Sequence, residues 1–158
     1  MRSWKEFIIT ASRKGDRSIA ILGGAYIKTH LGHILERFLV DDPGVQGFLL
    51  DEERSLGGLY SRIMICYALG LISEHEYHDL LLIHIINNEF LSVLDRNNFG
   101  EEDIAEMCYQ LKIPRDALLP MEEQTPRSLY LFTTAILAQQ LSLRIQQAEE
   151  DKRHPRMN

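Results

Sequence analysis

A short segment of the chain places several polar side chains inside an otherwise apolar stretch. It carries an imidazole, two amides, a carboxylate and a hydroxyl, at His84, Asn87, Asn88, Glu89 and Ser92. Burying such groups without partners would cost about 1–3 kcal/mol for each group. They must therefore bond to one another and to Arg62 or Arg17, or face a cavity or an interface. The sequence favours a structural polar network, and a functional pocket or contact surface is the alternative.

Two pairs of histidines, His30 with His33 and His75 with His78, have a spacing that can place both rings on one helix face. A metal site also needs a third and a fourth ligand. Near the second pair, these could come from the carboxylates of Glu74, Glu76 and Asp79. Acidic helix starts that contain histidine are common on protein surfaces, so we predict no metal site and no cofactor.

Two Gly-Gly pairs, Gly23-Gly24 and Gly57-Gly58, belong to no phosphate-binding motif of the GxxxxGK[ST] or GxGxxG type. We expect the first pair to let a neighbouring helix approach closely, and the second to form a turn or a helix start. The two cysteines lie in apolar segments without metal-ligand spacing, which favours buried free thiols.

The composition is that of one globular domain. The chain has 158 residues, of which 45% are hydrophobic and 25% charged, and no apolar run reaches the length of a membrane span. We expect one domain over residues 1–150 and a flexible tail over residues 151–158. We expect no membrane association and no signal peptide, and therefore a cytoplasmic location.

The net charge of −6 argues against a large sequence-independent affinity for DNA or RNA, because phosphate binding depends on clustered lysine and arginine. Basic residues do gather weakly near the two ends of the chain. They would form a positive patch if those ends lie close together: Arg2, Lys5, Arg13, Lys14 and Arg17 with Lys152, Arg153 and Arg156.

Local signals mark where helices begin and end. Candidate N-caps, each with a side chain able to accept a backbone N–H, are Ser3, Asp16, Ser73 and Thr125. Gly70 is a natural C-cap, and the run DDPG at 41–44 is expected to end a long helix.

Apolar residues recur at helical spacing, and no segment sustains the alternation of a strand. We therefore predict an all-α, single-domain bundle of about six to seven helices. One helix, over residues 74–94, is apolar around almost its whole circumference, so we expect it to be buried in the bundle centre. A loop or short helical turn is expected between Pro114 and Pro120. The other expected helices cover residues 4–12, 16–40, 56–69, 101–111 and 126–149.

Two long segments of the chain resemble the mannitol operon repressor (MtlR) family, including its YggD relatives. They read DRSIAILGGAYIKTHLGHILERFL and LLDEERSLGGLYSRIMICYALGLISEHEYHDLLLIHIINNEF. The resemblance lies in the Asp16-Arg17 start, the Arg62 segment that leads into ALGLIS, and the Asn88-Glu89-Phe90 step. It covers the chain from about residue 16 to residue 111.

The resemblance implies an all-helical protein linked to repression of a sugar-alcohol operon. Members of this family lack a helix-turn-helix, so repression is expected to act through a protein partner, such as a DNA-binding transcription factor. Direct sequence-specific DNA binding is not expected, which agrees with the acidic net charge. A homodimer is compatible with a small helical regulator, although no residue demonstrates one.

The family pattern also looks like a distant cousin of HEPN domains, whose ribonuclease members use an Arg-Asn…His motif near this point. Here Asn87 fills the arginine position, Ser92 fills the histidine position, and only Asn88 matches. The cation and the imidazole that the cleavage needs are missing, and His84 lies on the wrong side of the motif. We therefore predict a HEPN-like core without nuclease activity, and a protein that is not an enzyme.

The sequence as a whole predicts an MtlR-type regulatory or adaptor protein. Its polar set is expected to form salt bridges and hydrogen bonds inside the bundle, and comprises Asp16, Arg17, Arg62, Asn88 and Glu89. One alternative is a metabolite-sensing module that binds a small molecule, such as a sugar phosphate, in a pocket formed by these residues. The other is a catalytically inactive, HEPN-like protein associated with nucleic acid.

Overall fold

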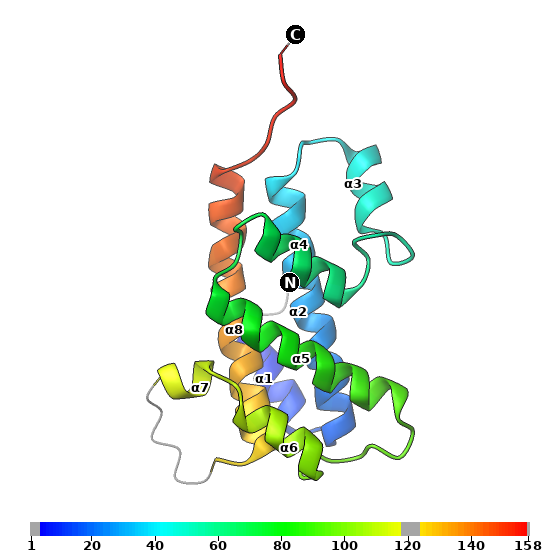
Figure 1. The fold of residues 1–158 in the computed structure, drawn as a ribbon, viewed down its shortest axis with the longest axis vertical. Coiled ribbons are helices and arrows are strands. Elements are labelled where there is room, and N and C mark those ends of the chain that lie inside the picture. The colour runs from blue at the N-terminus through cyan, green and yellow to red at the C-terminus, as the bar shows by residue number, and fades with distance from the viewer. Residues whose placement is uncertain (1–3, 118–123, 158) are drawn as a thin grey trace.

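The computed structural model describes residues 4–117 and 124–157, and within them it contains eight α-helices and no strand (Figure 1). The all-α prediction is confirmed. The helices are α1 (Trp4–Ser12), α2 (Asp16–Phe38), α3 (Pro43–Leu50), α4 (Leu59–Ala68), α5 (Glu74–Ser92), α6 (Glu102–Tyr109), α7 (Ile113–Asp116) and α8 (Pro126–Glu150).

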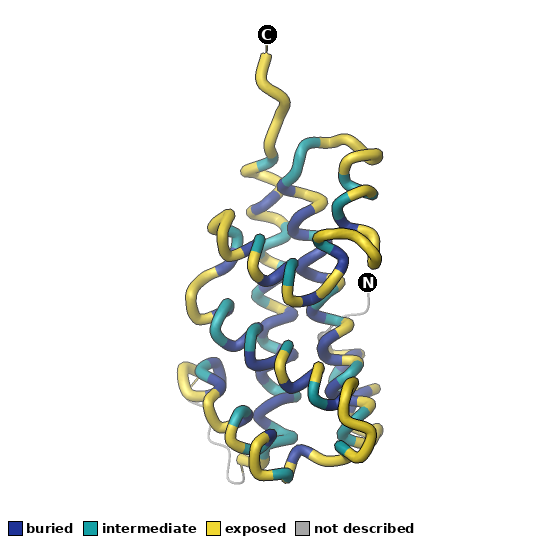
Figure 2. Tube along the Cα trace, turned by 45° about the vertical axis from the view of Figure 1, so that its right-hand side comes forward, coloured by how far each residue is buried: buried dark blue, intermediate teal, exposed yellow. Residues whose placement is uncertain are grey.

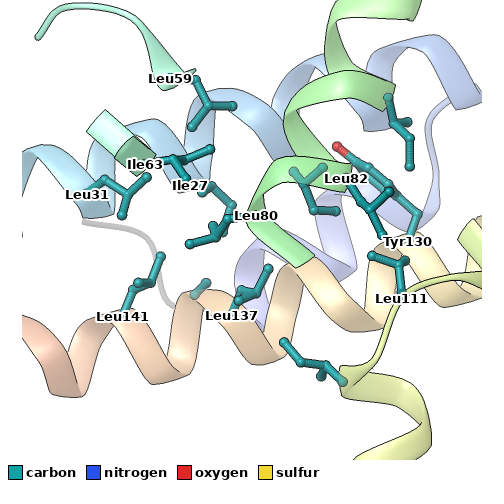
Figure 3. Close-up of a cluster of buried hydrophobic side chains, with 14 of the residues drawn as sticks. Ile27, Leu31, Leu59, Ile63, Leu80, Leu82, Leu111, Tyr130, Leu137 and Leu141 are labelled. Carbon is teal, nitrogen blue, oxygen red and sulfur yellow. The ribbon is translucent and has the colours of Figure 1, made fainter. Parts of the chain in front are cut away.

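The two longest helices, α2 and α8, run side by side in the same direction and form the centre of the bundle (Figure 1). Side chains from the facing surfaces meet in the core, with Ile27 and Leu31 from α2 and Leu137 and Leu141 from α8 (Figure 3). At the C-terminal ends of the two helices, Arg37 of α2 pairs with Glu149 of α8 at 3.0 Å. The buried stripes of these two helices supply much of the apolar area removed from water.

Helices α4 and α5 form a hairpin that crosses the outer side of this pair, and α6 follows α5 along the same side (Figure 1). Gly70 has φ +70°, the left-handed conformation that allows the chain to turn after α4. Ser73 and Glu76 then form the predicted capping box at the start of α5. Thr125 likewise caps α8, whereas the Ser3 prediction lies outside the described residues.

The prediction that the segment at 74–94 is buried all round is wrong. Helix α5 buries one side, with Leu80, Ile83 and Phe90 fully covered, and leaves the other open to solvent (Figure 2). Ile85 is 44% exposed and Leu91 is 52% exposed. An apolar circumference indicated burial on every side, but α2 and α8 already occupy the centre and cover only one side of α5.

Helix α3 was not predicted, because the DDPG run was interpreted only as the end of α2. The same residues also begin a new helix: the Asp42 carboxylate accepts the backbone N–H of Val45 at 3.0 Å, and Pro43 occupies the first turn. Asp16, predicted as a cap, is the first residue of α2, and Gly15 holds the cap position without a side-chain bond. Pro114 lies in α7, and Pro120 lies outside the described residues.

The glycines of α2 allow the close helix packing that the sequence predicted. A β-carbon at Gly23 would lie 2.7 Å from the Tyr130 hydroxyl, and one at Gly32 would lie 2.6 Å from the Arg62 guanidinium. One at Gly24 would collide with the Asn87 amide. Side chains from three different helices therefore use the space that these glycines leave open.

Among the described residues, the basic side chains near the two ends of the chain do not gather into one positive patch, and Arg2 lies outside the described residues. The first turn of α2 has Arg13, Lys14 and Arg17 around it. Arg153 contacts Phe38, which lies in the last turn of α2. A helix as long as α2 keeps these groups roughly 30 Å apart. Within the described residues, no helix combines the length and the hydrophobicity that a membrane-spanning segment needs.

Candidate functional site

Arg62 is buried and donates hydrogen bonds to three backbone carbonyls. Its Nε binds Leu56 O at 2.7 Å, and its two terminal nitrogens bind Lys28 O at 2.9 Å and Leu50 O at 2.7 Å. Burial lowers the pKa of Arg62, and the more distant carboxylates of Glu36 and Glu52 act against that shift. The arginine therefore ties α2, the end of α3 and the start of α4 together, and carbonyls take the place of the expected carboxylate partners.

Asn87 belongs to a different contact, in which two helices meet one carbonyl of α2. The Asn87 amide donates to Ala20 O at 3.0 Å, and the Tyr130 hydroxyl of α8 donates to the same oxygen at 2.9 Å. Burial raises the pKa of Tyr130, so its hydroxyl stays a donor. These contacts connect α2, α5 and α8 in the core, and they commit the Asn87 side-chain nitrogen to a backbone carbonyl.

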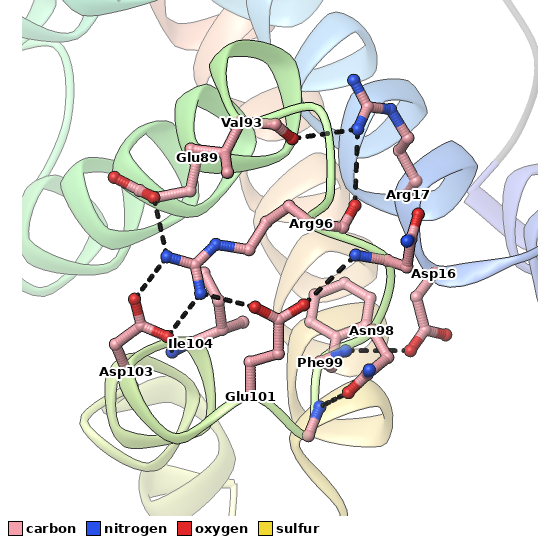
Figure 4. A network of polar contacts seen from close by, with 12 residues as sticks. Asp16, Arg17, Glu89, Val93, Arg96, Asn98, Phe99, Glu101, Asp103 and Ile104 are labelled. Atoms are coloured by element: carbon pink, nitrogen blue, oxygen red, sulfur yellow. Dashed lines mark hydrogen bonds and ion pairs between the residues drawn. The ribbon is translucent and has the colours of Figure 1, made fainter.

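Asp16, Arg17 and Glu89 lie in a network at the end of the bundle where α2 begins (Figure 4). Arg17 donates to the carbonyls of Val93, Leu94 and Arg96 at 3.1, 3.2 and 3.4 Å. The Asp16 carboxylate accepts the backbone N–H of Phe99 at 2.9 Å and also pairs with Arg127. Both residues hold the turn that follows α5.

Arg96 organises the second half of this network, and the sequence reasoning did not identify it. Its guanidinium pairs with Glu89 at 3.1 Å, Glu101 at 2.7 Å and Asp103 at 2.5 Å (Figure 4). The neighbouring carboxylates raise the pKa of Arg96, so it carries its charge at every physiological pH. An arginine in the turn, five residues before the acidic run at 101–103, was the signal that could have revealed it.

Asn88 is exposed, although it was predicted to be a buried member of the network. The nearest polar contact of its side chain is with the Ser92 hydroxyl at 3.5 Å. Asn87 and Asn88 face opposite ways, one toward Ala20 and one toward solvent. The predicted polar set is therefore distributed over separate places: the Arg62 site, the Asn87 contact, the network around Arg17 and Arg96, and the solvent side of α5.

His84 lies at the edge of α4 and α5, where its ring contacts Tyr60 with centroids 5.4 Å apart. Its Nδ1 is buried and has no hydrogen-bond partner among the described residues. Burial lowers the pKa of His84, so the ring is neutral near pH 7. A second aromatic contact, the stacked rings of Tyr67 and Tyr77 at 4.1 Å, continues the same seam between the two helices.

The outer side of the α4–α5 hairpin is an apolar surface whose middle carries no exposed full charge. The outward positions of α4 are 51%, 39% and 40% exposed at Tyr60, Met64 and Tyr67. The one full charge in α4 belongs to the buried Arg62, and the stretch LLLIHIINN of α5 contains no lysine, arginine, aspartate or glutamate. We call this surface the α4–α5 face; its apolar members are Tyr60, Met64, Tyr67, Leu81, Ile85 and Leu91.

A cavity of about 710 Å³ lies on another side of the bundle, between the start of α5, α7 and α8. Arg144 enters it while pairing with Glu76 at 3.2 Å, and His75 pairs with Asp116 at 3.1 Å. Gln140 also lines it, with a buried side-chain oxygen that lacks a partner in the described residues. None of the residues predicted to form a pocket lines this cavity.

The cysteines and histidines offer no metal centre in the described residues. No group of three or more histidine, cysteine, aspartate or glutamate side chains converges there. His78 bonds to its neighbour Asp79 at 2.7 Å, while His75 turns toward α7. Cys66 and Cys108 are buried free thiols, as predicted, and burial raises the pKa of each to about 12.

Comparison with known proteins gives one informative likeness. No family model and no curated protein matches the sequence. The structure is similar to a chain in the X-ray structure of the MtlR–HPr complex from Escherichia coli, with a TM-score of 0.71 and 20% sequence identity. The similar region covers 88% of this chain and 98% of that one. The HEPN-like core stays a prediction. The fold of this chain is that of MtlR, as the sequence resemblance implied.

Proposed function

We propose that this protein is an MtlR-type transcriptional regulator that acts in the cytoplasm by binding a protein partner. In this proposal it represses a sugar-alcohol operon without reading the operator itself. Binding and not catalysis is its activity, and HPr, or a DNA-binding transcription factor, is the partner. The observation that carries the proposal is the likeness to MtlR over nearly the whole of both chains, because that MtlR was crystallised in complex with HPr.

The surface chemistry supports a protein partner over nucleic acid. The chain carries a net charge of −6, and the basic residues near its two ends are separated by the length of α2. A backbone of phosphates is bound by clustered lysine and arginine. The α4–α5 face offers instead the aromatic, methionine and aliphatic side chains that are typical of protein interfaces.

Isothermal titration of the purified chain with HPr from the same bacterium tests the proposed partner. We expect saturable binding, and a titration without heat and without co-elution on a sizing column would contradict HPr as the partner. A mobility-shift assay with the promoter of the mannitol operon provides the second arm. We expect no shift by the chain alone, because a specific shift would contradict regulation through a partner.

A metabolite-sensing module is the second candidate, and the cavity between α5, α7 and α8 favours it. Its volume of about 710 Å³ is within the range of small-molecule sites, and Arg144 supplies a cation for an anionic group. Titration with mannitol 1-phosphate tests this candidate. Binding at millimolar ligand that is lost in Arg144→Met would support it, and no heat at that concentration would contradict it.

A further inference from the structure

We propose that the α4–α5 face is the docking surface for a folded protein partner whose own contact surface has an apolar centre and a rim of lysine and arginine. The inference rests on the proposed function, which requires a protein partner, and it adds where that partner binds and which chemistry it presents.

The centre of the α4–α5 face has the composition of a protein-binding hot spot. Tyrosine and methionine are enriched at interfaces, and charged residues are depleted from the centres of interfaces. Here Tyr60 and Tyr67 are each at least 40% exposed, and Met64 lies between them on the same helical side. The aromatic pairs to His84 and Tyr77 hold these rings against α5, so the face is fixed in shape before a partner arrives.

The rim next to α5 is acidic. On α6, which lies along α5, Glu102 and Glu106 are exposed one turn apart, and Tyr109 extends the same side with 55% of its surface exposed (Figure 1). Neither glutamate is in an ion pair with another residue of the described ranges. Asp103, between them, already pairs with Arg96.

The rim next to α4 is acidic as well. The turn before α4 exposes Asp51, Glu52 and Glu53, and Glu52 pairs with Lys28 at 2.5 Å. The one cation of that turn, Arg54, lies over the Phe48 ring at 4.8 Å. An apolar centre between two acidic rims attracts a partner with basic residues around an apolar patch, and this charge pattern also speeds encounter.

The same pattern disfavours the other occupants. Nucleic acid and anionic lipid carry negative charge, which the acidic rims repel. A second copy would bind through a two-fold axis that brings the same patch against itself, so acidic rims would oppose acidic rims. A partner of opposite charge meets neither obstacle.

A photo-cross-linking amino acid, p-benzoylphenylalanine, placed at Ile85 in the full chain tests the surface in the native cell. The same amino acid at Ile9 is the matched control, because Ile9 is 58% exposed on α1. We expect a protein adduct from position 85 that is absent from position 9. An adduct to a second copy, an adduct to nucleic acid, or no adduct at position 85 would overturn the proposal.

Variants of the centre of the α4–α5 face are then compared by their affinity for the purified partner that the cross-link identifies. Ile85→Asp is expected to weaken binding by about tenfold or more, and Ile9→Asp is expected to leave it unchanged. Asn88→Arg is the second variant of the centre, because it changes an exposed residue and avoids the risk that Ile85→Asp perturbs folding. Equal affinities of the partner for the wild type, Ile85→Asp, Asn88→Arg and Ile9→Asp would overturn the proposal.

The rim is tested by the dependence of affinity on salt. The double variant Glu102→Lys with Glu106→Lys is expected to weaken binding and to flatten its salt dependence, while Glu150→Lys at the end of α8 is the control. Strengthened binding by the double variant would contradict a basic partner.

The identity of the adduct separates this inference from the proposed partner. HPr captured at position 85 supports both. A different protein with an apolar, lysine- and arginine-rimmed surface supports the α4–α5 face and contradicts HPr. If HPr binds the wild-type chain and Ile85→Asp equally well, HPr remains the partner and the α4–α5 face is wrong.

Discussion

The side-chain amide of Asn87 occupies the space that a side chain at Gly24 would need. The amide cannot move away without losing its hydrogen bond to Ala20 O, and it is buried between α2 and α5. Gly24→Ala is therefore expected to destabilise the protein by about 1–3 kcal/mol, despite the better helix propensity of alanine.

Gly47→Ala is the matched control for that substitution. A β-carbon at Gly47 in α3 would meet nothing within 4 Å, so alanine should stabilise the protein by about 0.5–1 kcal/mol. Urea denaturation of both variants measures the free energies. Equal effects of the two substitutions would contradict the close packing of α2 against Asn87.

Arg62→Lys is expected to lower stability by about 2–4 kcal/mol, because one ammonium cannot bind the three carbonyls that the guanidinium binds. The carbonyls of Leu50 and Leu56 would be left without this donor, so the connection between α3 and α4 should open first. Thermal denaturation gives the loss of stability, and hydrogen exchange locates it. Unchanged exchange over residues 47–62 would show that Arg62 does not hold this segment.

The ion pairs of Arg96 predict a loss of stability in acid. The pKa of Asp103 is lowered chiefly by its bond to Arg96, and that of Glu101 chiefly by a backbone N–H and further by Arg96. A carboxyl whose pKa is lower in the folded state stabilises the protein above its ordinary value and loses that effect as pH falls through the folded value. Melting temperature should therefore decline below about pH 4.5, the ordinary value for glutamate.

The melting temperature of the variant Arg96→Met should decline less steeply than that of the wild type over the same acid range. Arg37→Met removes the exposed pair with Glu149 and serves as the control, expected to follow the wild-type profile. Parallel profiles of Arg96→Met and wild type would contradict the role of the network.

Two histidines predict a separate effect at higher pH. Burial is the main cause that lowers the pKa of both His30 and His84 below the ordinary value of 6.5. As pH falls below that value, the unfolded chain takes up protons that the folded chain refuses, so stability decreases. NMR titration of the ring protons measures both pKa values, with His30→Gln and His84→Gln to assign the signals. A value of 6.5 or more for either ring would contradict its burial.

The cysteines should be unreactive in the folded protein. Burial raises the pKa of Cys66 and Cys108 to about 12, so the thiolate is scarce at pH 8. Ellman's reagent should label neither thiol in the native state and both thiols in denaturant. Rapid labelling of the native protein would show that the segments around them open readily.

The sequence predicted most of the longer helices and the caps of α5 and α8, because those signals depend on residues near one another. Ser73 with Glu76, Gly70, and Thr125 with Pro126 are local signals, and the structure confirms each. The burial of α5 was wrong because periodicity shows which side of a helix is apolar and not how many neighbours compete for the centre. No local pattern indicates that α2 and α8 already fill it.

The polar residues also show that local sequence patterns do not reveal contacts between distant parts of the chain. Asp16, Arg17 and Glu89 do lie together at one end of the bundle, but Arg62 and Asn87 bind backbone carbonyls elsewhere. A carbonyl partner leaves no trace in the sequence, because every residue has one. Arg96 was not predicted because it lies in a turn, where no helical periodicity marks which side chains face the protein interior.

The parallel pairing of α2 with α8 also determines when the protein can fold on the ribosome. The contacts that join these helices, Asp16 with Arg127 and Ala20 with Tyr130, span 111 and 110 residues of sequence. While the nascent chain is still being synthesised, the apolar stripe of α2 has no α8 to cover it. The growing polypeptide therefore displays a chaperone-accessible stripe until α8 leaves the exit tunnel.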